Sequence, residues 1–184
     1  MNYMNQPAYL QKFSEVMDMN SNRQLTWSGK RGELTDKFGW TIPNMKLVNF
    51  LANESRDSNI IEVGAGNGYL AYEINKNGGN IIPIDIKEPQ DTWVSIKEMS
   101  YESLNPSETD NILLSWPPAS SKMGECCIEY INPTILYFIG KENSTVTGTE
   151  RFHSLIDNKY SIEEEFKLPS WTSNPTVFKK CVKI

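Results

Sequence analysis

Three glycines at alternate positions mark the part of this sequence that is best suited to hold a ligand. Gly64, Gly66 and Gly68 directly follow the apolar run Ile60–Val63, and the apolar-periodic segment YLAYEI comes next. The run is rich in β-branched residues, as buried strands are, so the predicted order is strand, glycine turn and helix. In doubly wound α/β folds this order places a ligand at the N-terminus of the helix. Glycine suits the turn because a Cβ atom would block close approach of the backbone and would disfavour a positive φ.

The residues around the glycines distinguish between the ligands that such turns hold. A dinucleotide fingerprint has the form G-x-G-x-x-G, but Tyr69 stands at its third glycine position. No Gly-Lys-Ser/Thr triplet occurs, so the sequence lacks a P-loop. Glu62 precedes the turn; this acid suits a zwitterionic amino-acid tail, whereas it would repel a pyrophosphate. A structural glycine turn without a ligand is the alternative interpretation.

The pattern acid-x-Gly-x-Gly-x-Gly resembles motif I of the class I S-adenosylmethionine-dependent methyltransferases. The resemblance implies that S-adenosylmethionine is the cofactor. The segments FGWTIP (38–43) and KLPSWTSNPTVF (167–178), with the turn WPP, are similar to small bacterial and viral methyltransferase-like proteins, so the likeness covers most of the chain from Phe38. The cofactor-binding residues that it implies in and around the turn are Glu62, Gly64, Ala65, Gly66, Asn67, Gly68 and Tyr69.

A second acid supports a nucleoside ligand. The segment NIIPIDIKE (80–88) has the character of a buried strand and contains Asp85, followed by Ile86. Asp85 lies about twenty residues beyond the glycine turn, where α/β nucleotide folds place the acid that binds ribose hydroxyls. A carboxylate can accept hydrogen bonds from both hydroxyls of a diol. We therefore expect Asp85 and Ile86 to contact the cofactor; since a nicotinamide enzyme uses the same acid, Asp85 does not choose between these cofactors. A surface Asp that caps the next segment is the alternative.

The sequence Ser115-Trp116-Pro117-Pro118 follows the predicted strand Asp110–Ser115. Ligands bind outside the carboxyl ends of the strands in open α/β sheets, so this turn should face the methyl group. Two prolines make the turn rigid, and the indole can contact a cationic sulfonium or stack on a substrate. The segment is similar to the D/N/S-P-P-aromatic motif of amino-methyltransferases, but Trp116 replaces the polar residue and Ala119 the aromatic one. These four residues are the catalytic candidates, and Ser115 is the displaced polar group, also expected to contact the cofactor; a core-capping Trp is the alternative.

The resemblance implies further contacts outside these motifs. Met99 would pack on the adenine and Ser100 would bind its edge. Trp40 and Pro43 would border the pocket, and Trp171 would cover its far side, which makes these three the candidates for substrate binding. Ordinary loop, helix-start and core positions are the alternatives for each of them.

Alternating strand and helix patterns predict one α/β domain with a Rossmann-like, mostly parallel sheet that ends in an antiparallel pair. This methyltransferase-like domain spans 41–184, with a helix that Thr41 caps and whose first turn contains Pro43. Residues 1–40 form an N-terminal extension with a helix over AYLQKFSEVMDM (8–19) and a loop over 20–32. The segment 99–109 is too short for a full crossover helix, so the fold should be trimmed there.

Composition places the protein among soluble globular proteins of the cytoplasm. The 184 residues are 39% hydrophobic and 22% charged, no apolar run reaches the length of a membrane span, and the N-terminus does not resemble a signal peptide. The net charge of −5 argues against general nucleic-acid binding. Three cysteines and one histidine favour neither a disulfide framework nor a metal site.

The combined expectation is a methyltransferase that uses S-adenosylmethionine and displaces its methyl group in line, mainly by orientation and desolvation. The acceptor is unidentified and can be nucleic acid, protein or a small molecule; no oligomeric state is predicted. One rival is a non-catalytic protein of the same fold that acts through a partner. The other is a nicotinamide oxidoreductase, which Tyr69 argues against.

Overall fold

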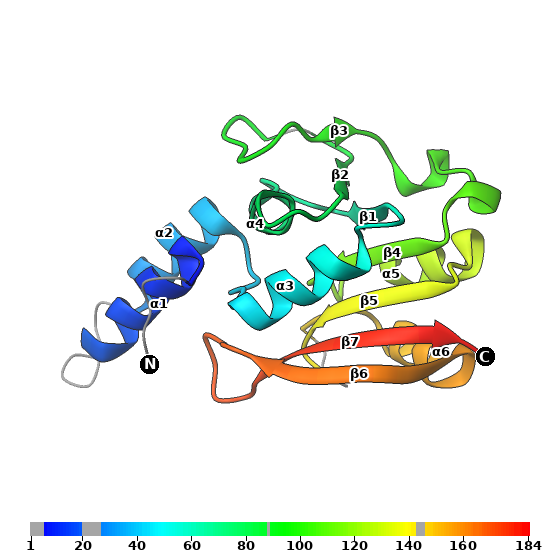
Figure 1. The fold of residues 1–184 in the computed structure, drawn as a ribbon. Coiled ribbons are helices and arrows are strands. Elements are labelled where there is room, and N and C mark those ends of the chain that lie inside the picture. The colour runs from blue at the N-terminus through cyan, green and yellow to red at the C-terminus, as the bar shows by residue number, and fades with distance from the viewer. Residues whose placement is uncertain (1–5, 20–26, 88, 143–145) are drawn as a thin grey trace.

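A seven-stranded sheet forms the centre of the protein (Figure 1). The computed structural model describes residues 6–19, 27–87, 89–142 and 146–184. The strand order is β3-β2-β1-β4-β5-β7-β6, in which β7 runs antiparallel to both of its neighbours and the other pairs are parallel. The strands are β1 (Ile60–Val63), β2 (Ile81–Asp85), β3 (Lys97–Glu98), β4 (Asn111–Ser115), β5 (Ile135–Gly140), β6 (Tyr160–Leu168) and β7 (Thr176–Lys183). The predicted sheet, mostly parallel with a terminal antiparallel pair, is confirmed.

Helices cover both faces of this sheet (Figure 1). On one face α3 and α4 pack against the strands through an apolar layer that includes Leu51 and Ile74. On the other face α5, a following π-helix and α6 bury residues such as Ile128 and Phe152. The helices are α1 (Ala8–Met19), α2 (Trp27–Phe38), α3 (Met45–Glu54), α4 (Tyr69–Lys76), α5 (Met123–Cys126), the π-helix Cys127–Ile131 and α6 (Glu150–Lys159).

The sequence of β4 reflects its central place in the sheet. Ile112, Leu113 and Leu114 are all fully buried, because their side chains alternate between two faces that are both covered by helices. The same reason explains the unbroken apolar run of β5, whereas in β1 Glu62 interrupts the apolar residues. These buried strands hold the loops at their carboxyl ends, where the glycine turn and the WPP turn begin.

The α1–α2 pair lies at one end of the sheet and has an aromatic core of its own (Figure 1). Tyr9 and Phe38 stack with ring centroids 4.9 Å apart, and both pack against Tyr69 at the start of α4. The buried Tyr69 hydroxyl accepts a hydrogen bond from the Tyr9 backbone N–H at 3.0 Å and donates to Glu73 at 2.9 Å. These contacts fix the N-terminal helices against the first helix after the glycine turn.

Two local expectations are wrong. The loop expected over 20–32 gives way to helix α2 from Trp27 onward, while residues 20–26 lie outside the described part of the chain. Asn44, and not Thr41, caps α3, since its side chain accepts the Leu47 N–H at 2.9 Å; the helix therefore begins after Pro43. Residues 123–131 form a short α-helix followed by a π-helix.

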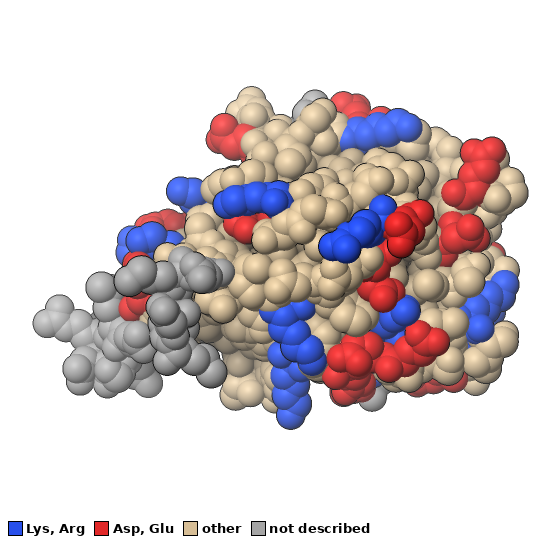
Figure 2. Space-filling view, in the orientation of Figure 1, with Lys and Arg blue, Asp and Glu red and all other residues tan. Residues whose placement is uncertain are grey.

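The trimmed crossover between β3 and β4 is confirmed. Two short 3₁₀ turns, Tyr101–Ser103 and Pro106–Glu108, replace a crossover helix there. None of the described helices is long and apolar enough to cross a membrane. On the face shown in Figure 2, basic and acidic side chains are interspersed.

Candidate functional site

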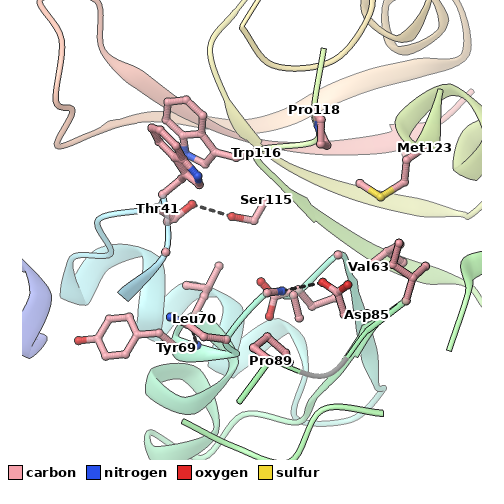
Figure 3. A pocket seen from close by; sticks show the side chains of 18 of the residues that line it. Thr41, Val63, Tyr69, Leu70, Asp85, Pro89, Ser115, Trp116, Pro118 and Met123 are labelled. Carbon is pink, nitrogen blue, oxygen red and sulfur yellow. Dashed lines mark hydrogen bonds between the residues drawn. The ribbon is translucent and has the colours of Figure 1, made fainter. Parts of the chain in front are cut away.

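A cavity of about 620 Å³ opens at the carboxyl ends of the parallel strands (Figure 3). Val63, Asp85 and Ser115, at or near the ends of β1, β2 and β4, all contribute to its wall. Ligand sites of open α/β sheets lie at this edge, so the position agrees with the sequence-based expectation. The predicted site residues that line it are Trp40, Glu62, Gly64, Ala65, Gly66, Asn67, Tyr69, Asp85, Ile86, Met99, Ser115, Trp116 and Pro118.

The glycines of the turn have different physical roles. Gly64, Gly66 and Gly68 have φ values of 72°, 56° and 74°, in the left-handed region that disfavours residues with a Cβ atom. A Cβ atom on Gly68 would lie 2.6 Å from Ile96 Cδ1, so Gly68 is required by packing and does not line the cavity. A Cβ atom on Gly66 would meet no described atom within 4 Å. Gly66 therefore leaves open the space that a ligand would use.

Asp85 fixes the turn and faces the cavity at the same time. Its Oδ2 accepts a hydrogen bond from the Gly66 backbone N–H at 2.9 Å. Asp85 is the last residue of β2, and Gly66 lies in the turn that follows β1. The bond therefore connects the carboxyl ends of two adjacent strands. The neighbouring Ile86 is 74% exposed and also lines the cavity, which leaves an apolar surface beside the carboxylate.

Glu62 is a buried acid with an unsatisfied oxygen. Its side chain is 2% exposed and lines the cavity, and its Oε2 has no hydrogen-bond partner among the described residues. Burial, followed by the nearby charge of Asp85, raises the pKa of the Glu62 carboxyl to about 8, although a backbone hydrogen bond from Ala71 opposes the shift. A buried polar atom without a partner is costly, so this oxygen indicates a missing donor on the cavity side.

The WPP turn is strained at its first residue. Trp116 has a φ of 53°, which is uncommon for a residue with a large side chain. Its backbone N–H donates to the Ile139 carbonyl at 2.7 Å, and the Gly148 N–H donates to the Pro117 carbonyl at 2.7 Å. These bonds hold the turn against β5 and the segment that follows it, which stabilises the strained conformation. The Trp116 Nε1 is buried and has no partner among the described residues; strain and unsatisfied groups of this kind are typical of functional sites.

Trp40 and Ser115 lie beside Trp116. The two indole centroids are 5.7 Å apart with an interplanar angle of 33°. Below them the Thr41 and Ser115 hydroxyls are hydrogen-bonded at 2.6 Å (Figure 3). The hydroxyl that we expected to replace the polar residue of the methyltransferase motif is therefore already paired with Thr41. In Figure 3 this group lies across the cavity from Asp85.

The end of α2 forms a wall that the sequence did not reveal. Thr35, Asp36, Phe38 and Gly39 line the cavity. The side-chain amide of Asn67, in the glycine turn, donates to the carbonyls of Asp36 and Lys37 at 3.2 and 2.9 Å, and the Trp93 Nε1 donates to the Lys37 carbonyl at 2.8 Å. The last carbonyls of α2 are thus satisfied by Asn67 of the glycine turn and by Trp93, a long-range form of helix capping. No local pattern in the sequence predicts these contacts.

Several predicted site residues lie elsewhere. Trp171 is buried and donates from its Nε1 to the Tyr9 hydroxyl at 2.9 Å; it packs in the N-terminal aromatic core instead of covering the pocket. Pro43 and Pro117 are buried and are not among the residues that line the cavity. Ser100 caps the 3₁₀ turn after β3 by accepting the Glu102 N–H, so its hydroxyl does not line the cavity as the resemblance implied. Tyr101, Met123 and Leu70 line it and were not predicted.

The titratable groups of the cavity are few. Among the described lining residues they are Asp36, Glu62, Tyr69, Asp85 and Tyr101, and the lining contains no histidine, lysine or cysteine. The described residues hold no cluster of three or more His, Cys, Asp and Glu side chains suited to a metal ion. The lining can therefore bind and orient a ligand, but its described residues include no side chain that commonly serves as a strong base.

Comparison with solved structures identifies the fold. Magnesium protoporphyrin IX methyltransferase from Synechocystis PCC 6803, with bound SAM, matches with a TM-score of 0.55 and 13% identity over 76% of this chain and 77% of that chain. The chain has the fold of the class I methyltransferases. The 1,6-didemethyltoxoflavin-N1-methyltransferase from Burkholderia thailandensis, with bound S-adenosylhomocysteine, matches with a TM-score of 0.54 and 12% identity over 96% of this chain and 88% of that chain.

A third similar structure is the tRNA (uracil-54, C5)-methyltransferase from Pyrococcus abyssi in complex with S-adenosyl-L-homocysteine. It matches with a TM-score of 0.50 and 15% identity over 74% of this chain and 37% of that chain. No model of a known protein family matches the sequence, and no curated protein matches it. The acceptors of the three enzymes differ in kind, so the shared fold leaves the acceptor of this chain open.

Proposed function

We propose that this protein binds S-adenosylmethionine in the cavity at the glycine turn and transfers its methyl group to an acceptor. The observation that carries the proposal is the Glu62 oxygen in the cavity wall that has no hydrogen-bond partner among the described residues, together with the open space in front of Gly66. The α-ammonium group of the cofactor is a donor of the charge and size that this carboxylate lacks. A dinucleotide would instead bring a pyrophosphate close to the acid Glu62, which would repel it.

Residues that line the cavity could contact the other parts of the cofactor. Asp85 has carboxylate lone pairs left for ribose hydroxyls beyond the bond that it accepts from Gly66. Ile86 and Met99 supply apolar surface for the adenine, and the glycine turn lets the backbone approach closely. The position of Ser100 gives no support to a contact with the adenine edge.

For methyl transfer, the protein mainly has to position the acceptor relative to the methyl group. The sulfonium of the cofactor supplies an activated methyl group. The residues of the WPP turn, with Trp40, would exclude water and align the acceptor with the methyl carbon, a contribution that can supply a large part of the rate. The lack of a lining histidine or lysine agrees with a nucleophile that needs no strong base.

Calorimetry with S-adenosylmethionine, S-adenosylhomocysteine and NAD tests the binding step. We expect both sulfur compounds to bind and NAD to bind weakly or not at all. A lack of binding by both sulfur compounds at about millimolar concentration, where even weak complexes form, would refute the proposal.

A matched pair of glycine variants tests the location. Gly66→Leu should abolish binding because its side chain enters the space in front of the turn. Gly78→Leu is the control: Gly78 also has a positive φ, 86°, and a Cβ atom there meets no described atom within 4 Å, but it lies at the end of α4 and does not line the cavity. Equal affinities of the two variants would show that the turn is not the site.

The alternative is a protein that binds the cofactor without transferring its methyl group. The pairing of Ser115 with Thr41, and a Trp in place of the polar residue before the prolines, favour this alternative. A transfer assay with tritiated S-adenosylmethionine against fractionated nucleic acid, protein and small-molecule extracts separates the two. Labelled product in one fraction supports transfer; binding without any labelled product supports the alternative.

A further inference from the structure

Two hydroxyl groups lie together in the cavity wall across from Asp85. Thr41 Oγ1 and Ser115 Oγ are 2.6 Å apart, and both residues line the cavity (Figure 3). Ser115 is the last residue of β4, whereas Thr41 lies in the segment between α2 and α3, so the fold brings together two hydroxyls that are 74 residues apart in the chain. Because Glu62 and Asp85 belong to the proposed cofactor end, this hydroxyl pair lies where an acceptor would meet the methyl group.

The hydroxyl pair keeps hydrogen-bonding capacity that no described residue uses. Each hydroxyl has one proton and two lone pairs, and the bond between them uses one proton and one lone pair. Neither side chain makes another hydrogen bond among the described residues. Thr41 is only 4% exposed and lines the cavity, so a further partner has to reach it from the cavity. A ligand there can donate to a hydroxyl oxygen or accept the remaining proton.

Two indoles lie beside the hydroxyl pair. Trp40 precedes Thr41 in the chain, and Trp116 follows Ser115. Both tryptophans line the cavity, and their ring centroids are 5.7 Å apart. Trp40 is 48% exposed, which leaves part of a large apolar side chain available for contact. A wall of this kind suits a planar aromatic ligand with a small number of polar groups.

The charged residues of the lining do not favour an ionic acceptor. They are the acids Asp36, Glu62 and Asp85, and no lysine, arginine or histidine is among the described lining residues. An anionic acceptor would therefore find no cation in this wall with which to pair. The wall also lacks the basic contacts that a phosphate backbone requires, and the protein has a net charge of −5, so a small molecule fits better than a nucleic acid.

The lining also restricts which nucleophiles can react. A protonated aliphatic amine, such as a lysine side chain, has no lone pair for the methyl group until a base removes a proton. An alcohol needs a base for the same purpose, and the described lining holds no histidine or lysine to act as one. The amino group of an aromatic ring is uncharged near neutral pH and keeps its lone pair without a base.

From these observations we infer that Thr41 and Ser115 select the methyl acceptor, which is the uncharged amino group of a small aromatic molecule. The inference rests on the proposed function, which places the cofactor at the glycine turn. One N–H of the acceptor donates to a hydroxyl oxygen of the pair, while the ring packs against the indoles. The nitrogen lone pair forms a bond to the methyl carbon as the sulfur–carbon bond breaks, and the electron pair of that bond stays on sulfur. The methylated nitrogen then carries a positive charge and releases a proton to solvent.

Four quinolines that differ in one substituent test this inference: an amino, a methyl, an aminomethyl or a carboxylate group. Their affinities for the full-length protein are measured by calorimetry at saturating S-adenosylhomocysteine and near neutral pH, where the first two are uncharged, the third is a cation and the fourth is an anion. We expect the amino compound to bind about fivefold more tightly than the methyl compound of similar shape, as one added hydrogen bond predicts, and both ions to bind more weakly than the amino compound.

Three results of this series would overturn the inference. They are equal affinities of the amino and methyl compounds, tighter binding of either ion, and no binding by any of the four. A short oligoadenylate that binds more tightly than AMP would overturn the choice of a small molecule.

Threonine variants assign the selectivity to the hydroxyl pair. The measured quantity is the ratio of the affinities for the amino and methyl compounds, because damage to the wall would weaken both alike. Thr41→Val should reduce this ratio, Thr41→Ser should keep it, and the double variant Thr41→Val/Ser115→Ala should bring it to about one, since both hydroxyls are then absent. Thr35→Val is the matched control: Thr35 also lines the cavity, but its hydroxyl donates to the Gly32 carbonyl at 3.0 Å.

The ratio should stay at the wild-type value in Thr35→Val. A double variant that keeps the wild-type ratio would refute the role of the hydroxyl pair, and so would a Thr35→Val variant that loses the ratio as fully as the double variant does.

Binding of S-adenosylhomocysteine to the wild-type protein separates this inference from the proposed function. If S-adenosylhomocysteine binds but the quinolines show no preference for the amino group, only the inference about the acceptor fails. If S-adenosylhomocysteine does not bind at all, the proposed function fails and the inference fails with it.

Discussion

The raised pKa of Glu62 predicts that the affinity for the proposed cofactor depends on pH. Below its pKa of about 8 the buried carboxyl is mostly protonated, because burial and the charge of Asp85 disfavour the carboxylate. The ammonium group of the cofactor would pair with the ionised form, so binding should release a proton from Glu62. We therefore expect the affinity for S-adenosylhomocysteine to rise as the pH increases from about 5.5 to about 7.5. Calorimetry in two buffers with different ionisation enthalpies measures both the affinity and the released proton.

The variant Glu62→Gln tests the same residue without its charge. It should bind S-adenosylhomocysteine more weakly than the wild type near neutral pH, and its affinity should lose the dependence on pH. A wild-type affinity that does not change over this pH range would contradict the pairing of Glu62 with the ammonium group.

The raised pKa of Glu62 also affects the stability of the free protein. The affinity for the cofactor should rise with pH, whereas the free energy of unfolding should fall. The folded pKa of Glu62, about 8, lies above the ordinary value of 4.5, so the folded state binds more protons than the unfolded state between these pH values. The contribution of Glu62 to the free energy of unfolding therefore falls as the pH rises through this window. Denaturant unfolding without ligand should show Glu62→Gln gaining stability relative to the wild type between about pH 5 and pH 8. A constant difference between the two proteins would show that Glu62 is already ionised.

At the scale of elements, the sequence predicts those that carry their own local signal. The apolar runs of β4 and β5 are unbroken because both faces of the sheet are covered, and alternate glycines mark the turn after β1. Helix α2 lacks such a signal: its sequence WSGKRGELTDKF contains two glycines, and Phe38 is its only residue that the structure describes as buried. Its conformation depends on tertiary contacts, which periodicity does not report.

The contacts at the end of α2 explain why the site was predicted only in part. Asn67 was expected to contact the cofactor, and the structure shows in addition that it binds carbonyls about thirty residues earlier in the chain. Trp171 was assigned to the pocket although its indole N–H has a buried partner, the Tyr9 hydroxyl, at the other end of the chain. Both contacts join segments far apart in the sequence, so neither has a local pattern.

The link between Asn67 and α2 can be tested by a single substitution. Asn67→Ala removes two hydrogen bonds to the last carbonyls of α2 and the bond that Asn67 Oδ1 accepts from the Tyr69 N–H at 3.2 Å. It should lower the free energy of unfolding by about 1–2 kcal/mol. It should also weaken S-adenosylhomocysteine binding, since the end of α2 forms a wall of the cavity. Asn53→Ala, near the end of α3, is the control because its side chain binds only the exposed Arg56 in the described structure and lies away from the cavity. Equal losses of unfolding free energy in both variants would show that the hydrogen bonds between Asn67 and α2 stabilise the protein no more than an exposed side-chain contact.

At the scale of the whole molecule, the division into an extension (1–40) and a domain (41–184) does not coincide with the cavity. Thr35, Asp36, Phe38 and Gly39 of the extension line it together with the strand ends of the domain. The aromatic contacts of Tyr9 and Phe38 with Tyr69 join the same two parts. Helix α2 of the extension therefore forms part of the cavity wall, and a ligand that fills the cavity would touch both parts at once.

This arrangement predicts which parts of the molecule respond to the cofactor. A ligand that binds only the folded state slows the exchange of backbone amide hydrogens most where it adds contacts, because local opening there must first release the ligand. With saturating S-adenosylhomocysteine we expect slower exchange in two separate segments, 35–41 and 62–69, as measured by mass spectrometry. The strands β6 (160–168) and β7 (176–183), at the far edge of the sheet from β2, provide the internal control and should change little. Protection confined to 62–69 would contradict a wall built by α2, and protection centred on β6 and β7 would place the ligand outside the cavity.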